Sequence, residues 1–360
     1  MASITKHVTK LADGRELIYF DDADTNLKPA RSADARALDS RPDTAVMRQD
    51  VLTGEWISIA AARQNRAFLP PADQDPLAPA TPANPSEIPA NYDVAVFENR
   101  SPSFGPALGH PDIAGIDFVR TAPASGRCEV VCFSPEHEGS FGTQTVSRAR
   151  TVIEAWADRT ETLSALPGIQ QVFPFENRGE EIGVTLHHPH GQIYAYPYIT
   201  PRTQRLIASI EKVGPELFER ILETERASQR VVLSGEHWTA FVPFAARWPI
   251  EVHMLPHRNL PDFAATNAEE RSELASLYLT LLRGIDQIYD TPTPYIAAWH
   301  QAPVNVKRDE IRLMLQLTSP RRAATKLKYL AGSEAAMGAW IGDVLPEQSA
   351  ELVRQGIARL

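Results

Sequence analysis

The stretch His187-His188-Pro189-His190-Gly191-Gln192 places three of the chain's ten histidines within four residues. In an extended chain, residues two apart face the same way, so His188, His190 and Gln192 share one face. Pro189 stiffens this presentation, and Gly191 removes a side chain where a bulky group must approach the backbone. A neutral imidazole with one nitrogen held by a carbonyl can attack phosphorus with the other nitrogen. The stretch therefore predicts a phosphate-handling site, with a polar histidine-rich loop and a zinc pair as the alternatives.

The elements that must position these histidines recur along the chain. The sequence patterns predict a strand over 128–134, a helix over 147–166 and strands over 169–177 and 191–199, and then strands within 238–256, a helix over 267–290 and strands over 294–300 and 310–317. Because strands, one helix and two strands follow one another twice, we expect an internal duplication of an α+β unit. Residues 68–90 hold seven prolines, which predicts a rigid irregular loop.

The composition of this 360-residue chain limits the classes of partner and the cellular location that we expect. A net charge of −9 argues against binding to nucleic acid or to a membrane surface, since both favour a basic protein face. No run reaches the roughly 18 apolar residues of a membrane span, and the N-terminus has no signal-peptide pattern. Cys128 and Cys132 lie four residues apart on a predicted strand, too far for a disulfide. We therefore expect a cytoplasmic protein.

The segment "FENRGEEIGVTLHHPHGQIYAYP" (175–197) resembles the active-site segment of the galactose-1-phosphate uridylyltransferase family, in the histidine-triad superfamily. Further stretches resemble that family in the same order, among them "VLTGEWISIAAARQNR", "VVCFSPEH", "YIAAWHQAP" and "KLKYLAGSE", so the resemblance covers nearly the whole chain from about residue 45. It implies an α+β, histidine-triad-like fold, an antiparallel half-barrel sheet built from two related strand-helix-strand units with outer helices. The expected units are residues 1–200, with the nucleotide site, and 201–360, with a helical insert and a hexose-phosphate segment.

The resemblance also implies a ping-pong reaction, in which His190 takes a uridylyl group from UDP-glucose and passes it to galactose 1-phosphate. The His188 backbone carbonyl would orient the His190 ring, and Gln192 would hold the phosphoryl group where the hydrolase branch of the superfamily has a histidine. The remaining matches are with residues of the nucleotide and phosphate site, Arg63, Arg66, Asn99, Glu176, Asn177 and Thr185, and of the hexose 1-phosphate site, Lys328, Ser333 and Glu334. A homodimer with shared active sites follows from the family.

Two other functions use the same scaffold. One is a nucleoside-diphosphate-sugar phosphorylase or adenylyltransferase, and the other is a non-catalytic sugar-nucleotide-binding paralogue. UDP-galactose and other hexose 1-phosphates are further expected ligands, and no organic cofactor is expected.

The sequence departs from the resembled family at its metal sites. Many members bind zinc through a Cys-x-x-Cys pair and two histidines; here the cysteine positions fall on Asp75 and Ala78, while His137 and His188 persist. A structural zinc normally has four nitrogen or sulfur ligands. We therefore expect at most one weakly held zinc, at His137 and His188 with Asp75 as a third ligand and His187 as a substitute. At a second family site His300 persists, but Met314 and Gln316 stand at the other positions, so no metal is expected there.

Overall fold

The computed structural model describes residues 3–27, 31, 34–38, 41, 45–65, 68–106 and 118–360. The strands are β1 Thr5–Lys10, β2 Glu16–Asp21, β3 Val46–Gln49, β4 Trp56–Ile59, β5 Val94–Glu98, β6 Thr121–Pro123, β7 Arg127–Cys132, β8 Gln171–Arg178, β9 His190–Tyr196, β10 Val231–Ser234, β11 Trp238–Phe241, β12 Ile250–Pro256, β13 Tyr295–His300, β14 Met314–Ser319, β15 Arg321–Ala323 and β16 Lys326–Leu327. The α-helices are α1 Val146–Ser164, α2 Pro201–Val213, α3 Leu217–Arg226, α4 Ala268–Asp286, α5 Gly332–Met337 and α6 Pro346–Ile357. Short 3-10 helices are η1 Ala61–Asn65, η2 Ala72–Gln74, η3 Phe141–Thr143 and η4 Glu180–Ile182.

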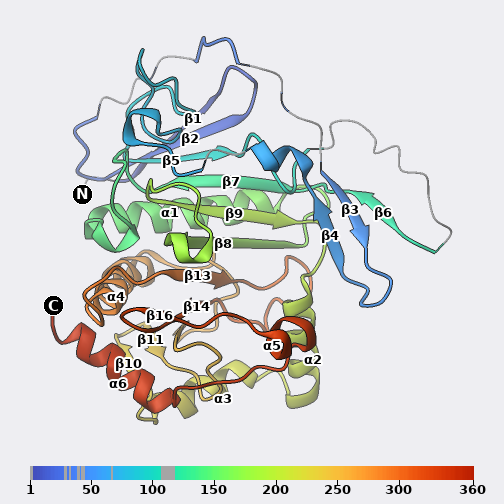
Figure 1. Cartoon of the computed structure of the whole chain (residues 1–360), viewed down its shortest axis with the longest axis vertical. Coiled ribbons are helices and arrows are strands. Elements are labelled where there is room, and N and C mark those ends of the chain that lie inside the picture. Colours follow the sequence, from blue (N-terminus) through green and yellow to red (C-terminus); the bar gives the residue numbers. More distant parts are fainter. Residues whose placement is uncertain are drawn as a thin grey trace.

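Eleven strands of the described chain form one sheet in the order β1-β2-β5-β7-β9-β8-β13-β14-β12-β11-β10 (Figure 1). Every neighbouring pair in this sheet is antiparallel, and the edge strands β1 and β10 do not meet. The predicted α+β class with an open antiparallel sheet is therefore confirmed.

The predicted duplication is visible in the strand order. In chain order, β5, β7, α1, β8 and β9 match β11, β12, α4, β13 and β14, and the sheet orders 5-7-9-8 and 13-14-12-11 mirror each other across the β8–β13 pair. The sheet runs unbroken through that pair, where Phe175 lies opposite Ala298. The division of the chain at residues 200 and 201 stays a prediction.

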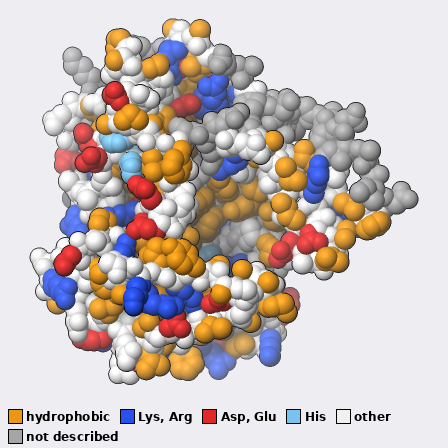
Figure 2. Space-filling model, in the orientation of Figure 1, with side chains coloured by type: hydrophobic (Ala, Val, Ile, Leu, Met, Phe, Trp, Pro, Cys, Tyr) orange, Lys and Arg blue, Asp and Glu red, His pale blue; other side chains and the backbone are white. Residues whose placement is uncertain are grey.

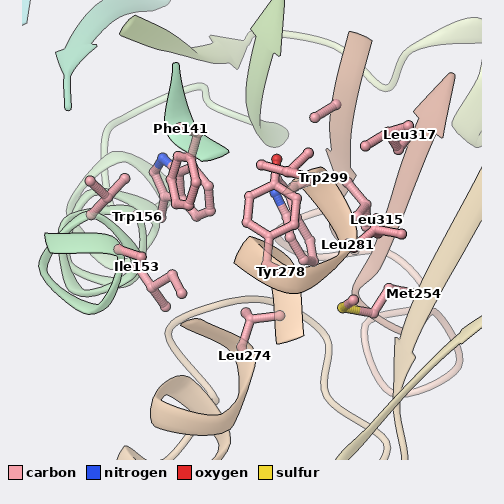
Figure 3. Close-up of a cluster of buried hydrophobic side chains, with 14 of the residues drawn as sticks. Phe141, Ile153, Trp156, Met254, Leu274, Tyr278, Leu281, Trp299, Leu315 and Leu317 are labelled. Atoms are coloured by element: carbon pink, nitrogen blue, oxygen red, sulfur yellow. The ribbon is translucent and has the colours of Figure 1, made fainter. Parts of the chain in front are cut away.

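Helices α1 and α4 pack against each other on one face of the sheet (Figure 1). Both begin at well-formed caps: Thr145 accepts from the Arg148 N–H, and Asn267 forms a capping box with Glu270. Their apolar faces meet in the core of Figure 3, where Trp156, Tyr278 and Trp299 lie in mutual ring contact. Burial of such large rings is a major source of folding free energy.

The face that the helices cover decides which side chains remain available for chemistry. Along β9, Gly191, Ile193 and Ala195 are buried, and Ile193 and Ala195 belong to the same apolar core as α1. The alternating residues His190 and Gln192 therefore point to the opposite face. The catalytic candidates lie on the side of the sheet away from the two helices.

Strands β3, β4 and β6 form a separate three-stranded sheet that projects from the main body (Figure 1). In the space-filling view, a hollow lined with hydrophobic side chains lies between this projection and the body (Figure 2). Phe104 makes ring contacts with Tyr194, Tyr196 and Tyr198, in an apolar cluster that also contains Met47 of β3 and Ala122 of β6. None of the helices within the described residues is both long and apolar enough to cross a membrane.

Candidate active site

His190 and Gln192 line a pocket of about 300 Å³. Asn99 and Thr185, two residues expected from the resemblance, line the same pocket. Strands β7 and β8 hold β9 on both sides, since His190 pairs with Cys132 and Gln192 pairs with both Val130 and Phe175. Of the three residues predicted to share a face, His190 and Gln192 line the pocket, whereas the buried His188 ring contacts Asp75 and Ser134 and does not line it.

The His190 ring has the orientation expected of a nucleophile. Its Nδ1 lies 2.7 Å from the backbone oxygen of His188, and because a carbonyl only accepts, Nδ1 donates. This tautomer carries its lone pair on Nε2, the nitrogen that can attack phosphorus.

Gly191, which lies between the two site residues, packs too closely against its neighbours to carry a side chain. A Cβ at this position would lie 2.8 Å from the Phe133 ring and 2.9 Å from the Phe175 backbone oxygen. Any larger residue would displace β9 from its neighbours and move His190 and Gln192 with it.

The proline-rich loop reaches this site through Asp75, which is fully buried. Asp75 Oδ2 lies 2.7 Å from His188 Nδ1 and 2.9 Å from His137 Nδ1, and Asp75 Oδ1 accepts from the Leu77 N–H at 2.9 Å. Burial acts to raise the pKa of Asp75, but the hydrogen bonds and charge of His188 outweigh it and bring the pKa to about 2. Asp75 is therefore a carboxylate shared by two histidines.

The expected nucleotide-site residues do not all reach the pocket. Arg63 donates from Nη1 to the backbone oxygen of Ser101, a pocket residue, at 3.1 Å, whereas Arg66 lies outside the described residues. Asn177 follows Phe175 on the same face of β8 but is not among the described residues that line the pocket. Glu176 points to the other face and is buried under the sheet, where Tyr295 donates to it at 3.0 Å.

The expected hexose-phosphate residues lie together but are engaged with one another. Lys328 is buried, donates to the backbone oxygens of Arg247 and Ile341, and pairs with Glu334 at 3.2 Å. Ser333 donates to the Ala339 backbone oxygen at 2.9 Å. Within one chain, these three side chains hold the segment 328–341 in shape and do not line the pocket of His190.

Sequence reasoning missed Arg100, which lines the pocket beside Asn99. The signal was present, because the tetrapeptide Phe-Glu-Asn-Arg occurs at both 97–100 and 175–178. In each copy the glutamate is buried and lies at or near the end of a strand. The asparagine that follows it therefore faces the opposite side of the sheet. Tyr92 was also missed; its hydroxyl donates to the Leu77 oxygen and lies 3.0 Å from His188 Nε2.

At the second family metal site, where no metal is expected, the side chains form a chain of hydrogen bonds. Gln316 donates to Glu251 at 2.7 Å, and its oxygen lies 3.2 Å from His300 Nε2. Burial, and then the nearby charge of Arg202, lowers the pKa of His300 to about 3, which keeps this ring neutral.

Comparison with known proteins gives the following matches. A family model described as galactose-1-phosphate uridyl transferase, N-terminal domain, matches residues 33–200, and its C-terminal counterpart matches residues 203–358. The chain is 44% identical to the galactose-1-phosphate uridylyltransferase of Streptomyces lividans, with 97% of each protein covered. It is 32% identical to the enzyme of the same name from Thermotoga maritima, over 86% of this chain and 98% of the relative.

Solved structures agree with these matches. A structure described as uridylyltransferase superposes with a TM-score of 0.79 at 30% identity, covering 87% of this chain and 99% of the other. An ADP-glucose phosphorylase from Arabidopsis thaliana superposes with a TM-score of 0.62 at 20% identity, covering 86% and 97%. The second likeness shows a shared fold alone.

Proposed function

Because the chain belongs to the galactose-1-phosphate uridylyltransferase family, we propose that it transfers a uridylyl group from UDP-glucose to galactose 1-phosphate through a covalent bond to His190. The observation that carries the covalent step is the 2.7 Å contact from His190 Nδ1 to the His188 oxygen, in a pocket shared with Gln192. This contact fixes both the tautomer and the direction of the ring.

The first half-reaction would form the bond between His190 Nε2 and the α-phosphorus of UDP-glucose, and glucose 1-phosphate would leave. The ring then carries a positive charge, and its Nδ1–H donates to the His188 oxygen. Gln192 would donate to a phosphoryl oxygen as negative charge develops, and Arg100 would supply positive charge to the pocket. An amide cannot protonate a leaving group, so Gln192 suits a stable intermediate.

The second half-reaction would reverse these steps with a different sugar. A phosphate oxygen of galactose 1-phosphate attacks the uridylyl phosphorus, the bond to Nε2 breaks, and UDP-galactose leaves. His190 returns to its neutral form, so the cycle needs no external proton donor.

We further propose that the protein acts as a homodimer. The segment 329–345 exposes six large apolar side chains, Tyr329, Leu330, Met337, Trp340, Ile341 and Leu345. Apolar exposure gathered in one segment favours a protein partner. A cytoplasmic location is also proposed, and the free buried thiols of Cys128 and Cys132 support it.

The experiment that tests the covalent step is incubation with UDP-glucose, followed by intact-mass analysis and peptide mapping. We expect a uridylyl adduct on the peptide that contains His190, and no adduct in His190→Asn. The variant should also lose exchange between UDP-glucose and labelled glucose 1-phosphate while keeping its circular dichroism spectrum. An adduct from ADP-glucose in place of UDP-glucose would favour the adenylyltransferase alternative, and undiminished exchange in His190→Asn would exclude the covalent mechanism.

A further inference from the structure

The residues at the expected zinc position do not fit a zinc ion. His188 Nδ1 faces the Asp75 carboxylate at 2.7 Å, and His188 Nε2 faces the Ser134 backbone oxygen at 2.8 Å. Both nitrogens of this ring are therefore engaged within the protein, and Nε2 also lies 3.0 Å from the Tyr92 hydroxyl, so neither nitrogen is directed at a metal ion. Among the described residues, no group of three or more histidine, cysteine or acidic side chains is arranged to hold a metal ion.

The hydrogen bond between Asp75 and His188 is buried. The side chains of Asp75 and His188 are exposed by 1% and 0% respectively. His137 donates to the same Asp75 oxygen from the protein surface, where its side chain is 18% exposed. A buried carboxylate requires hydrogen-bond donors, so the contacts with His188, His137 and the Leu77 N–H hold Asp75 in place.

Asp75 connects this pair to both walls of the pocket. Its Oδ1 accepts from the N–H of Leu77, which lines the pocket, and the Leu77 oxygen accepts from Tyr92, whose hydroxyl also contacts His188. On the other wall, His188 carries the backbone oxygen that accepts from His190 Nδ1. One carboxylate therefore fixes the proline-rich loop and, through His188, the ring of the proposed nucleophile.

The backbone around His188 has little freedom to compensate for a loss of this carboxylate. The Pro189 oxygen accepts from the Phe133 N–H at 3.0 Å, and the His188 ring contacts the next residue, Ser134. The position of the His188 oxygen thus depends on where its own ring is anchored.

We propose that Asp75 replaces a metal ion in this chain, as a positioning residue that sets the His190 ring for nucleotidyl transfer. The inference rests on the proposed function for its catalytic part and on the contacts of Asp75 for its structural part. Loss of such positioning lowers the rate of the chemical step, while substrate binding, which uses other groups, changes little.

The test compares Asp75→Asn with Asp73→Asn, a matched control that removes the same charge at an exposed position of the same loop. The adduct on His190 is followed by rapid quenching and intact mass at several UDP-glucose concentrations. We expect Asp75→Asn to lower the maximal rate of adduct formation by roughly 10- to 100-fold with little change in the half-saturating concentration. Asp73→Asn should match the wild type.

Metal content is measured in parallel on wild-type protein purified without chelator, and this measurement needs no variant to fold. We expect far less than one zinc per chain and no effect of EDTA on the unfolding midpoint. Stoichiometric zinc, or a wild-type adduct rate in Asp75→Asn, would overturn the inference. No adduct in the wild type would instead overturn the proposed function, and the positioning role of Asp75 with it.

Discussion

Glu176 offers a quantitative test of the fold beneath the site. Its side chain lies on the helix side of β8, with one carboxyl oxygen accepting from Tyr295 and the other, Oε2, without a partner in the described structure. Burial raises the pKa of this carboxyl from 4.5 to about 7, and the Tyr295 hydrogen bond and the Arg178 charge offset only part of that effect. Glu176→Gln keeps the shape of the side chain and removes its ionisation.

The sign and size of the effect follow from the two pKa values. Below about pH 4.5 the carboxyl is protonated in the folded and the unfolded chain, so its ionisation does not affect stability. Between pH 4.5 and 7 the Glu176 carboxyl ionises only in the unfolded chain, so the free energy of unfolding falls as the pH rises. Above pH 7 the carboxyl ionises in both states, and the loss of stability stops growing. At about 1.4 kcal/mol per pH unit, the loss reaches about 3 kcal/mol. Glu176→Gln should not show it.

The assay is urea unfolding of wild type and Glu176→Gln at pH 5 and pH 8. We expect the stability of the variant relative to the wild type to rise by about 2 to 3 kcal/mol between the two pH values. Glu161→Gln, at an exposed position of α1, is the matched control and should show no such rise. A relative stability independent of pH would refute the argument, because it would mean that the Glu176 carboxyl is already ionised inside the fold.

Two further predictions concern the pocket and the C-terminal segment. Gln192→His should lower transfer by about 10²-fold and raise hydrolysis of UDP-glucose relative to transfer, measured as the ratio of free UMP to UDP-galactose; an unchanged ratio would remove the role proposed for the amide. Lys328→Met should speed proteolytic cleavage within 328–341, because the bonds to Arg247, Ile341 and Glu334 are lost, whereas the exposed Lys326→Met should not. Equal cleavage in both variants would show that Lys328 does not hold the segment.

Periodic patterns predicted the regular elements well and their ends less well. The helix expected over 147–166 is found at Val146–Ser164, and the helix expected over 267–290 ends at Asp286. The second prediction ran too far because apolar residues continue past the last helical turn, and periodicity alone does not separate such a run from the helix. Alternation also predicted one face for His188, His190 and Gln192; the pocket confirms this for His190 and Gln192, but His188 does not line it.

The contacts that organise the site could not be predicted from the sequence. Asp75 lies 113 residues before His188, and their bond depends on how the proline-rich loop folds back onto β9. The opposite faces of Glu176 and Asn177 follow from alternation, but which face lies under the helices depends on the pairing of β8 with β13. Likewise, the sequence alone suggests that Lys328 is an available cation, whereas in the structure it lies about 6 Å from the rings of Trp248 and Trp340, which contact each other.

The duplication leads to a last prediction about the number of sites. Strand β14 occupies the place in the second unit that β9 has in the first, and because Leu315 and Leu317 are buried in the core, Met314 and Gln316 face the same side as His190 and Gln192. A methionine thioether lacks the proton-bearing, reversible chemistry of imidazole, and the Gln316 amide is bonded at both ends, to Glu251 and to His300. Strand β14 therefore carries no imidazole at the positions that correspond to His190 and Gln192, and the second unit supports β8 through β13. We expect one uridylyl group per chain even at saturating UDP-glucose, counted by intact mass; a second adduct, or an adduct that survives in His190→Asn, would show that the second unit also carries chemistry.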